Sequence, residues 1–179
     1  RWEPPEDAAL ILVDTTYSSR LARIGERRKL AAVIDHHPSE TQSHPSLSFR
    51  FRDVRPRSIA SSSIVAGYLR EKKVIPSLPL APALVYGITS DATGCHAPYS
   101  RADRAILSWL TQYSDPQLLT QIESALLPKA YFQDLLLAIE NCFTYDDVAL
   151  CILPKATGSE LVGEMADLLM RCEGIRRLL

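Results

Sequence analysis

Apolar residues along the chain fall into short continuous runs and into longer stretches with helical spacing. A strand covered on both faces is apolar throughout, so the continuous runs at residues 9–14 and 30–35 predict buried strands. Apolar residues spaced by three and four predict amphipathic helices instead. In chain order, we expect strands near 9–14, 30–35, 47–52 and 147–153, and helices near 18–28, 60–73, 80–90, 101–113, 116–126, 129–142 and 158–172.

Several of these helices have recognisable starts. Three serines, Ser61 to Ser63, precede an apolar helical pattern, and Ser100 is followed three residues later by Asp103 in the order of a capping box. Pro116 stands at a place suited to the first residue of a helix. Strands that alternate with helices predict an α/β fold, an open parallel sheet flanked by helices.

A domain boundary is expected between residues 126 and 145. Residues 131–143 have the spacing of an amphipathic helix, which we interpret as a link between two domains. We therefore divide the chain into an N-terminal α/β domain at 1–127, a linker helix at 128–144 and the beginning of a second, smaller α/β domain at 145–179. A plain extension of the first domain is the alternative for the last segment.

Composition narrows the class of protein. The chain has 179 residues, of which 46% are hydrophobic and 23% charged, as in ordinary globular proteins. Its apolar runs are shorter than the roughly 20 residues of a membrane span, and no secretory signal opens it, so we expect a cytoplasmic protein without a membrane partner. The net charge of -1 argues against a general nucleic-acid coat protein. The four cysteines form no C-x-x-C pair and predict neither a zinc site nor a disulfide framework.

Acidic and imidazole side chains stand where the apolar runs end. Asp14 closes the first run, Asp35, His36 and His37 close the second, and Asp91 closes a later apolar stretch. Parallel strands bring their carboxyl ends to one edge of the sheet, where ligands bind. A helix cap or a turn is the alternative for Asp14 or Asp91 taken alone. Because Asp and His suit Mn²⁺ and similar ions, the three run ends together predict a metal site.

In order and spacing, the segments LILVDT, VIDHHP and GITSDATG resemble the DHH phosphoesterases over residues 10–93. Members of this family cleave phosphoanhydride or phosphodiester bonds with two Mn²⁺ ions. The resemblance implies that Asp14, His36 and Asp91 are metal ligands and that His37 contacts the scissile phosphate. It also implies that Asp35 orients the histidines, as an acid beside a ligating histidine usually does. Asp35 and His37 are thus the catalytic candidates.

The chain departs from the family pattern at both ends. It opens with RWEPPEDAAL, and no His-x-x-x-Asp-x-Asp motif, which supplies the remaining ligands in the family, stands in it. We expect a fragment that lacks this motif. Alternatively the motif has been lost, and the protein is a catalytically inactive nucleotide-binding or assembly module. The Gly-Gly-His-type loop that closes the family's second domain is also not found before Leu179.

The resemblance points most to the oligoribonuclease and nucleotide-phosphatase branch of the family. We therefore expect a Mn²⁺-dependent phosphodiesterase acting on short oligonucleotides or small nucleotides, in preference to an inorganic pyrophosphatase. Mg²⁺ in place of Mn²⁺ and a homodimeric assembly are left open. Arg50 and Arg52 are candidates for a basic rim that guides phosphates, or else for a charged edge strand. His96 is a further candidate for substrate contact.

Overall fold

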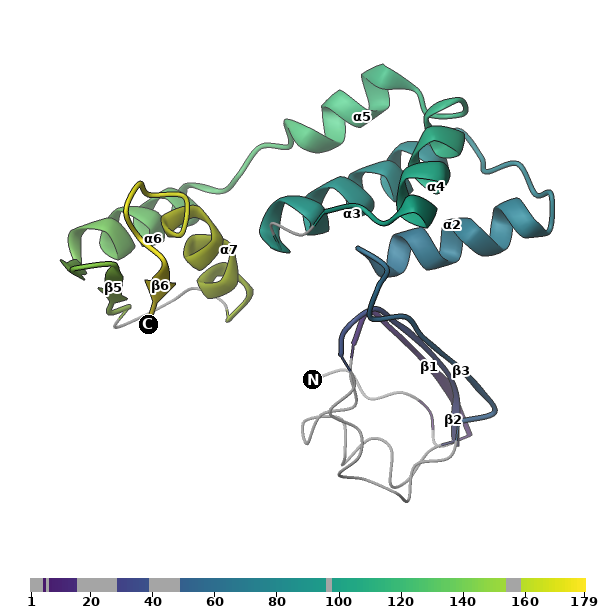
Figure 1. Ribbon diagram of the computed structural model, residues 1–179, viewed down its shortest axis with the longest axis horizontal. Helices are drawn as coiled ribbons and strands as arrows, with labels where there is room; N and C mark the ends of the chain where they lie inside the picture. Colours follow the sequence, from purple (N-terminus) through teal and green to yellow (C-terminus); the bar gives the residue numbers. More distant parts are fainter. Residues whose placement is uncertain (1–4, 6, 16–28, 39–48, 96–97, 154–158) are drawn as a thin grey trace. The chain divides into compact units, whose positions relative to one another are not determined.

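The computed structural model describes residues 5, 7–15, 29–38, 49–95, 98–153 and 159–179 (Figure 1). The chain divides into two compact units, Arg1–Ser124 and Ala125–Leu179. The expected helix at 18–28 and the candidate His96 lie outside the described residues. The expected domain boundary after residue 127 stays a prediction; by compactness the division falls a few residues earlier.

A parallel sheet forms the base of the first unit. It consists of β1 (Ala9–Val13), β2 (Lys29–Asp35) and β3 (Phe51–Val54), in the order β1-β2-β3. Figure 1 shows the three strands side by side. With the helices that follow β3, this sheet confirms the predicted α/β class.

Two details of the sheet differ from the sequence interpretation. The third strand was expected at 47–52, but pairing with β2 begins only at Phe51, opposite Ala32, and continues to Val54. The predicted bounds were wrong because they were centred on the alternation of apolar and basic residues. The strand forms only where β2 offers hydrogen-bond partners, and those lie opposite residues 51–54. In β1 the expected burial on both faces is met at Leu12, while Ile11 and Val13 are 62% and 50% exposed.

Four helices follow the sheet: α2 (Ser61–Glu71), α3 (Leu80–Cys95), α4 (Arg101–Thr111) and α5 (Pro116–Glu123). The capping box of Ser100 and Asp103 opens α4, and Pro116 occupies the first turn of α5 behind the cap Asp115, as predicted. Buried apolar side chains from α2, α3, α4 and the two residues before α2 form one core, against which Trp109 packs. These are Ile59, Ala60, Ala66, Leu84, Val85, Ile88, Ile106 and Leu110.

Helix α3 is longer than its sequence indicates. It was expected to end near residue 90, ahead of Asp91, but it continues to Cys95. The hydroxyls of Thr89, Ser90 and Thr93 donate to carbonyls three or four residues earlier in the same helix. Since these polar side chains bond to the helix itself, they do not end it. Asp91 therefore lies within the last turns of a helix.

The second unit contains α6 (Lys129–Glu140), β4 (Cys142–Tyr145), β5 (Val148–Cys151), α7 (Ser159–Leu169) and β6 (Arg177–Leu178). Strands β4 and β5 form an antiparallel hairpin, and β6 pairs with β5 in parallel. The helix predicted at 129–142 ends at Glu140, and β4 was not predicted at all. The helical spacing of 131–143 runs into Phe143, Thr144 and Tyr145, whose aromatic and branched side chains favour the strand they form.

Among the residues that the structure describes, no helix is long and apolar enough to cross a bilayer.

Candidate metal centre

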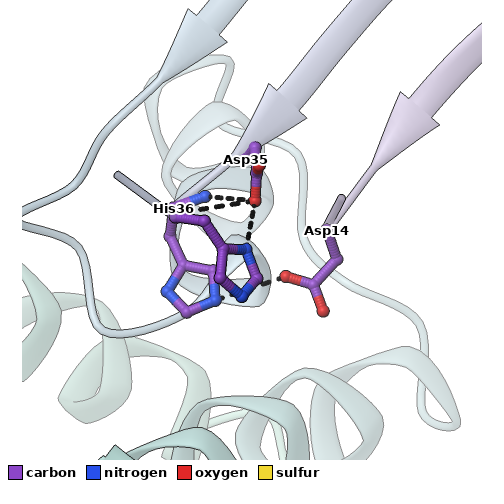
Figure 2. Close-up of side chains that lie close together, drawn as sticks. Asp14, Asp35 and His36 are labelled. Carbon is purple, nitrogen blue, oxygen red and sulfur yellow. Dashed lines mark hydrogen bonds and ion pairs between the residues drawn. The ribbon is translucent and has the colours of Figure 1, made fainter. Parts of the chain in front are cut away.

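Two neighbouring strands end at one edge of the sheet, and each delivers an acid there. β1 pairs with β2 in parallel up to Val13 opposite Ile34, so Asp14 and Asp35 follow at the same level. The backbone N–H of Asp14 donates to the carbonyl of Ile34 at 3.0 Å. Asp14 has φ of 57°, a left-handed conformation that Asp tolerates better than most residues. This turn ends β1 and leaves the carboxylate directed toward His36 (Figure 2).

The carboxylate of Asp35 organises the loop after β2. It is 1% exposed, and its Oδ1 accepts from the backbone N–H groups of His36 at 2.8 Å and His37 at 3.2 Å. The same oxygen lies 2.7 Å from Nδ1 of the His37 ring. A carboxylate only accepts, so Nδ1 carries the proton and Nε2 of His37 is left for another partner. Asp35 thus orients the ring of His37, which is half exposed, rather than the ring of His36.

The ring of His36 faces two other acids. Its Nε2 lies 3.4 Å from Oδ1 of Asp14 and 3.8 Å from Oδ2 of Asp91. The His36 side chain is 11% exposed, against 51% for Asp14 and 34% for Asp91. Three segments far apart in the sequence, the ends of β1 and β2 and the last turns of α3, therefore converge on one imidazole nitrogen.

This convergence affects the charge of Asp91. Burial raises the pKa of the Asp91 carboxyl, the nearby charge of Asp14 raises it further, and His36 and His37 act in the opposite direction. Two carboxylates that share a half-buried site repel each other, and a cation between them relieves that repulsion.

The donor set fits a divalent cation. Asp14, Asp35, His36 and His37 each offer a ligand atom, and these atoms lie within 4.8 Å of one another. Imidazole nitrogen and carboxylate oxygen are ligands that Mn²⁺ and related ions accept. The second oxygen of Asp35, Oδ2, is buried without a hydrogen-bond partner among the described residues. Buried polar atoms are rarely left without a partner.

Not every predicted site residue is brought to this edge. Arg50 precedes β3 and Arg52 pairs with Val33, which places both toward the end of β3 opposite the Asp35 edge. Both are exposed, and Arg52 takes part in an interaction of its own. The strand register therefore favours the alternative interpretation of these arginines, a charged strand at the border of the described sheet.

A polar group that the sequence did not reveal follows β3. Arg55 donates from Nε and Nη2 to both oxygens of Asp53, at 2.8 and 2.7 Å, and the Tyr68 hydroxyl of α2 donates to Asp53 as well. The guanidinium also lies 5.6 Å from the centre of the Tyr68 ring. Tyr68 carried no signal beyond its helical spacing, because its partner is 15 residues away. The group ties α2 to the sheet.

Comparisons with known proteins bear on the fold. No protein-family model matches the chain. An uncharacterized protein of Methanocaldococcus jannaschii is 30% identical over 167 residues, which are 93% of this chain and 34% of that protein. The chain therefore spans about a third of the length of this relative.

Two solved structures share the fold. An exopolyphosphatase-related protein from Bacteroides fragilis matches with a TM-score of 0.56 and 17% identity, over 87% of this chain and 47% of that one. A protein of Methanococcus jannaschii, described as a candidate family II inorganic pyrophosphatase, matches with a TM-score of 0.54 and 17% identity. That match covers 94% of this chain and 61% of the other. The α/β architecture around the candidate site is thus one found in both proteins.

Proposed function

We propose that this chain is part of a metal-dependent phosphoesterase of the DHH family, acting on phosphodiester bonds of short oligonucleotides or small nucleotides. The observation that carries the proposal is the meeting of Asp14, His36 and Asp91 at one point, beside a His37 ring fixed by Asp35. The two structural neighbours, both named after phosphoanhydride substrates, support phosphorus chemistry at this fold. The motif order from Leu10 to Thr93 supports the family.

Asp14, His36 and Asp91 are the residues that would hold a divalent ion. Such an ion, Mn²⁺ in first place and Mg²⁺ as the alternative, would supply a nucleophilic water at neutral pH and neutralise charge on the reacting phosphate.

His37 has a separate task in this proposal. Asp35 fixes its ring through Nδ1, which leaves Nε2 at the half-exposed side. A protonated His37 donates from Nε2 to a non-bridging oxygen of the phosphate, and the Asp35 carboxylate balances the imidazolium charge. A donor already held in place acts on charge that develops in the transition state without reorganising first.

A phosphoanhydride substrate is the second candidate, since both structural neighbours carry such names. A catalytically inactive nucleotide-binding or assembly module is the alternative of another class. It would keep the same cluster without turnover.

The test uses the full-length protein with Mn²⁺ and three substrates: a linear dinucleotide, inorganic pyrophosphate and polyphosphate. We expect the dinucleotide to be hydrolysed with the highest kcat/KM, and His36→Ala to abolish turnover at the Mn²⁺ concentration that supports the unsubstituted protein. Ser108→Ala, at an exposed position of α4, is the matched control and should retain full activity. Faster cleavage of pyrophosphate or polyphosphate would mean that the substrate is a phosphoanhydride and not a short oligonucleotide or small nucleotide. Nucleotide binding without turnover of any of the three substrates would mean that the protein is a binding module and not an enzyme.

A further inference from the structure

Two cysteines of the second unit face each other across the β4–β5 hairpin. The strand register places Cys142 directly opposite Cys151, at the open end of the hairpin. Both residues are partly buried, and both are free thiols. Cys172, a further free thiol of the second unit, is exposed and lies outside the hairpin.

The hydrogen-bond pattern decides how close this pair is. In an antiparallel ladder, hydrogen-bonded pairs alternate with non-hydrogen-bonded pairs, whose Cα atoms are only ~4.5 Å apart. The N–H of Ile152 donates to the carbonyl of Asn141 at 3.2 Å, so the pair next to the cysteines is hydrogen-bonded. Cys142 and Cys151 therefore occupy a non-hydrogen-bonded pair. Its spacing lies within the roughly 4.4–6.8 Å range that a disulfide spans.

Both thiols lie on the inner face of the hairpin. Cys151 Sγ donates to the carbonyl of Ala138 in α6 at 3.3 Å, and Ala149, which lies two residues before Cys151 on the same face, is 2% exposed. The outer face carries Phe143 and Leu150, which are 63% and 44% exposed. Burial raises the pKa of Cys151, and the neighbouring charge of Cys142 raises it further, as expected for sulfurs close together.

We propose that Cys142 and Cys151 form a reversible cross-strand disulfide by exchange with a low-molecular-weight disulfide. The thiolate of Cys142 attacks one sulfur of the reagent, which releases the first thiolate and leaves a mixed disulfide. Cys151 then gives its proton to solvent and attacks the Cys142 sulfur, which releases the second. The two protein sulfurs are oxidised and the two reagent sulfurs are reduced, so electrons and protons balance.

Cys142 attacks first because the Cys151 thiol has the raised pKa and is engaged with Ala138. Closure of the bond removes the Cys151 hydrogen bond to α6 and locks the open end of the hairpin. The same end supports the last strand, since the N–H of Cys151 donates to the carbonyl of Leu179 at 2.9 Å. The disulfide thus joins β4 to β5 and releases the Cys151 hydrogen bond to α6.

The experiment exposes the folded full-length protein to oxidised glutathione and maps the products by peptide mass spectrometry after alkylation. We expect one peptide pair joined through Cys142 and Cys151, two hydrogens lighter, and full reversal by dithiothreitol. Cys151→Ser should stop at a glutathione adduct on Cys142. Cys142→Ser should leave Cys151 largely unmodified over the same time.

A matched control is Cys172→Ser, which removes the exposed thiol and should leave the Cys142–Cys151 link unchanged. Adducts on the separate thiols of the unsubstituted protein without a link, or a link from either residue to Cys172, would overturn the proposal. Because the main readout is made on the unsubstituted protein, it does not depend on the folding of any variant.

Discussion

His37 Nδ1 lies 2.7 Å from Oδ1 of Asp35, and that one oxygen also accepts the backbone N–H groups of His36 and His37. A single buried carboxylate therefore shapes the turn that presents both histidines and fixes one of the two rings. The His36 ring is left free to face Asp14 and Asp91. Because the two adjacent imidazoles have different neighbours, we expect His36 to affect metal affinity and His37 to affect the rate.

Substitution Asp35→Asn tests how the fixed ring contributes to rate. The amide can still accept the backbone N–H groups, but it no longer balances an imidazolium at His37. We expect activity to fall by about 10–100-fold, the usual cost of removing an orienting partner of this kind. Steady-state kinetics with saturating Mn²⁺ is the measurement, and a change in KM alone would argue against an orienting role. Asp35→Ala should in addition lower stability by ~1–3 kcal/mol, because backbone N–H groups lose their acceptor.

The paired variants His36→Ala and His37→Ala test the division directly. His36→Ala should weaken Mn²⁺ binding, with activity partly restored by high Mn²⁺. His37→Ala should leave Mn²⁺ affinity nearly intact and lower kcat by about 10²–10³-fold, since it removes a donor that acts in the transition state. Calorimetric titration of Mn²⁺ into both variants distinguishes them. Equal losses of affinity would make both histidines ligands.

The site could be anticipated from the sequence wherever a strand ends. Asp14 and Asp35 follow strands that pair in parallel, and parallel strands bring their carboxyl ends to one edge. That argument needed only the apolar runs and the sense of the strands. The left-handed backbone of Asp14 could not be foreseen, because a side chain that tolerates such a φ does not require it.

The element that carries Asp91, and the whole of β4, escaped the same reasoning. Asp91 was placed where an apolar run ends, but it approaches His36 from within α3, which continues to Cys95. Strand β4 was missed because an amphipathic helical spacing runs into it without a break, and only pairing with β5 makes it a strand. Local patterns predict elements well, but the residues at which they stop depend on partners elsewhere in the chain.

The pH dependence of stability should report on Tyr68. Burial, and then the hydrogen bond to Asp53, raise the pKa of Tyr68 from 10.0 to about 12. The folded protein then holds a proton that the unfolded chain releases, so this contribution to stability is complete below pH 10 and is lost as pH rises toward 12. Tyr68→Phe should flatten that decline. Urea unfolding of both proteins at several pH values across this window is the measurement, and parallel declines would contradict the assignment.

Two glycines in the helices of the first unit should respond oppositely to alanine. A Cβ on Gly67 in α2 meets nothing within 4 Å, so Gly67→Ala should stabilise the protein by ~0.5–1 kcal/mol through helix propensity.

A Cβ on Gly87 in α3 would lie 2.3 Å from Oγ of Ser62, so Gly87→Ala should destabilise the protein by ~1–3 kcal/mol through overpacking between α2 and α3. Adding Ser62→Ala removes the clashing oxygen and should recover much of that loss, leaving a Cβ contact of 3.2 Å to be relaxed. Free energies of unfolding from urea titrations of the singles and the double give the coupling. If the effects of Gly87→Ala and Ser62→Ala simply add, the close contact between Gly87 and Ser62 is not the reason why a glycine is needed there.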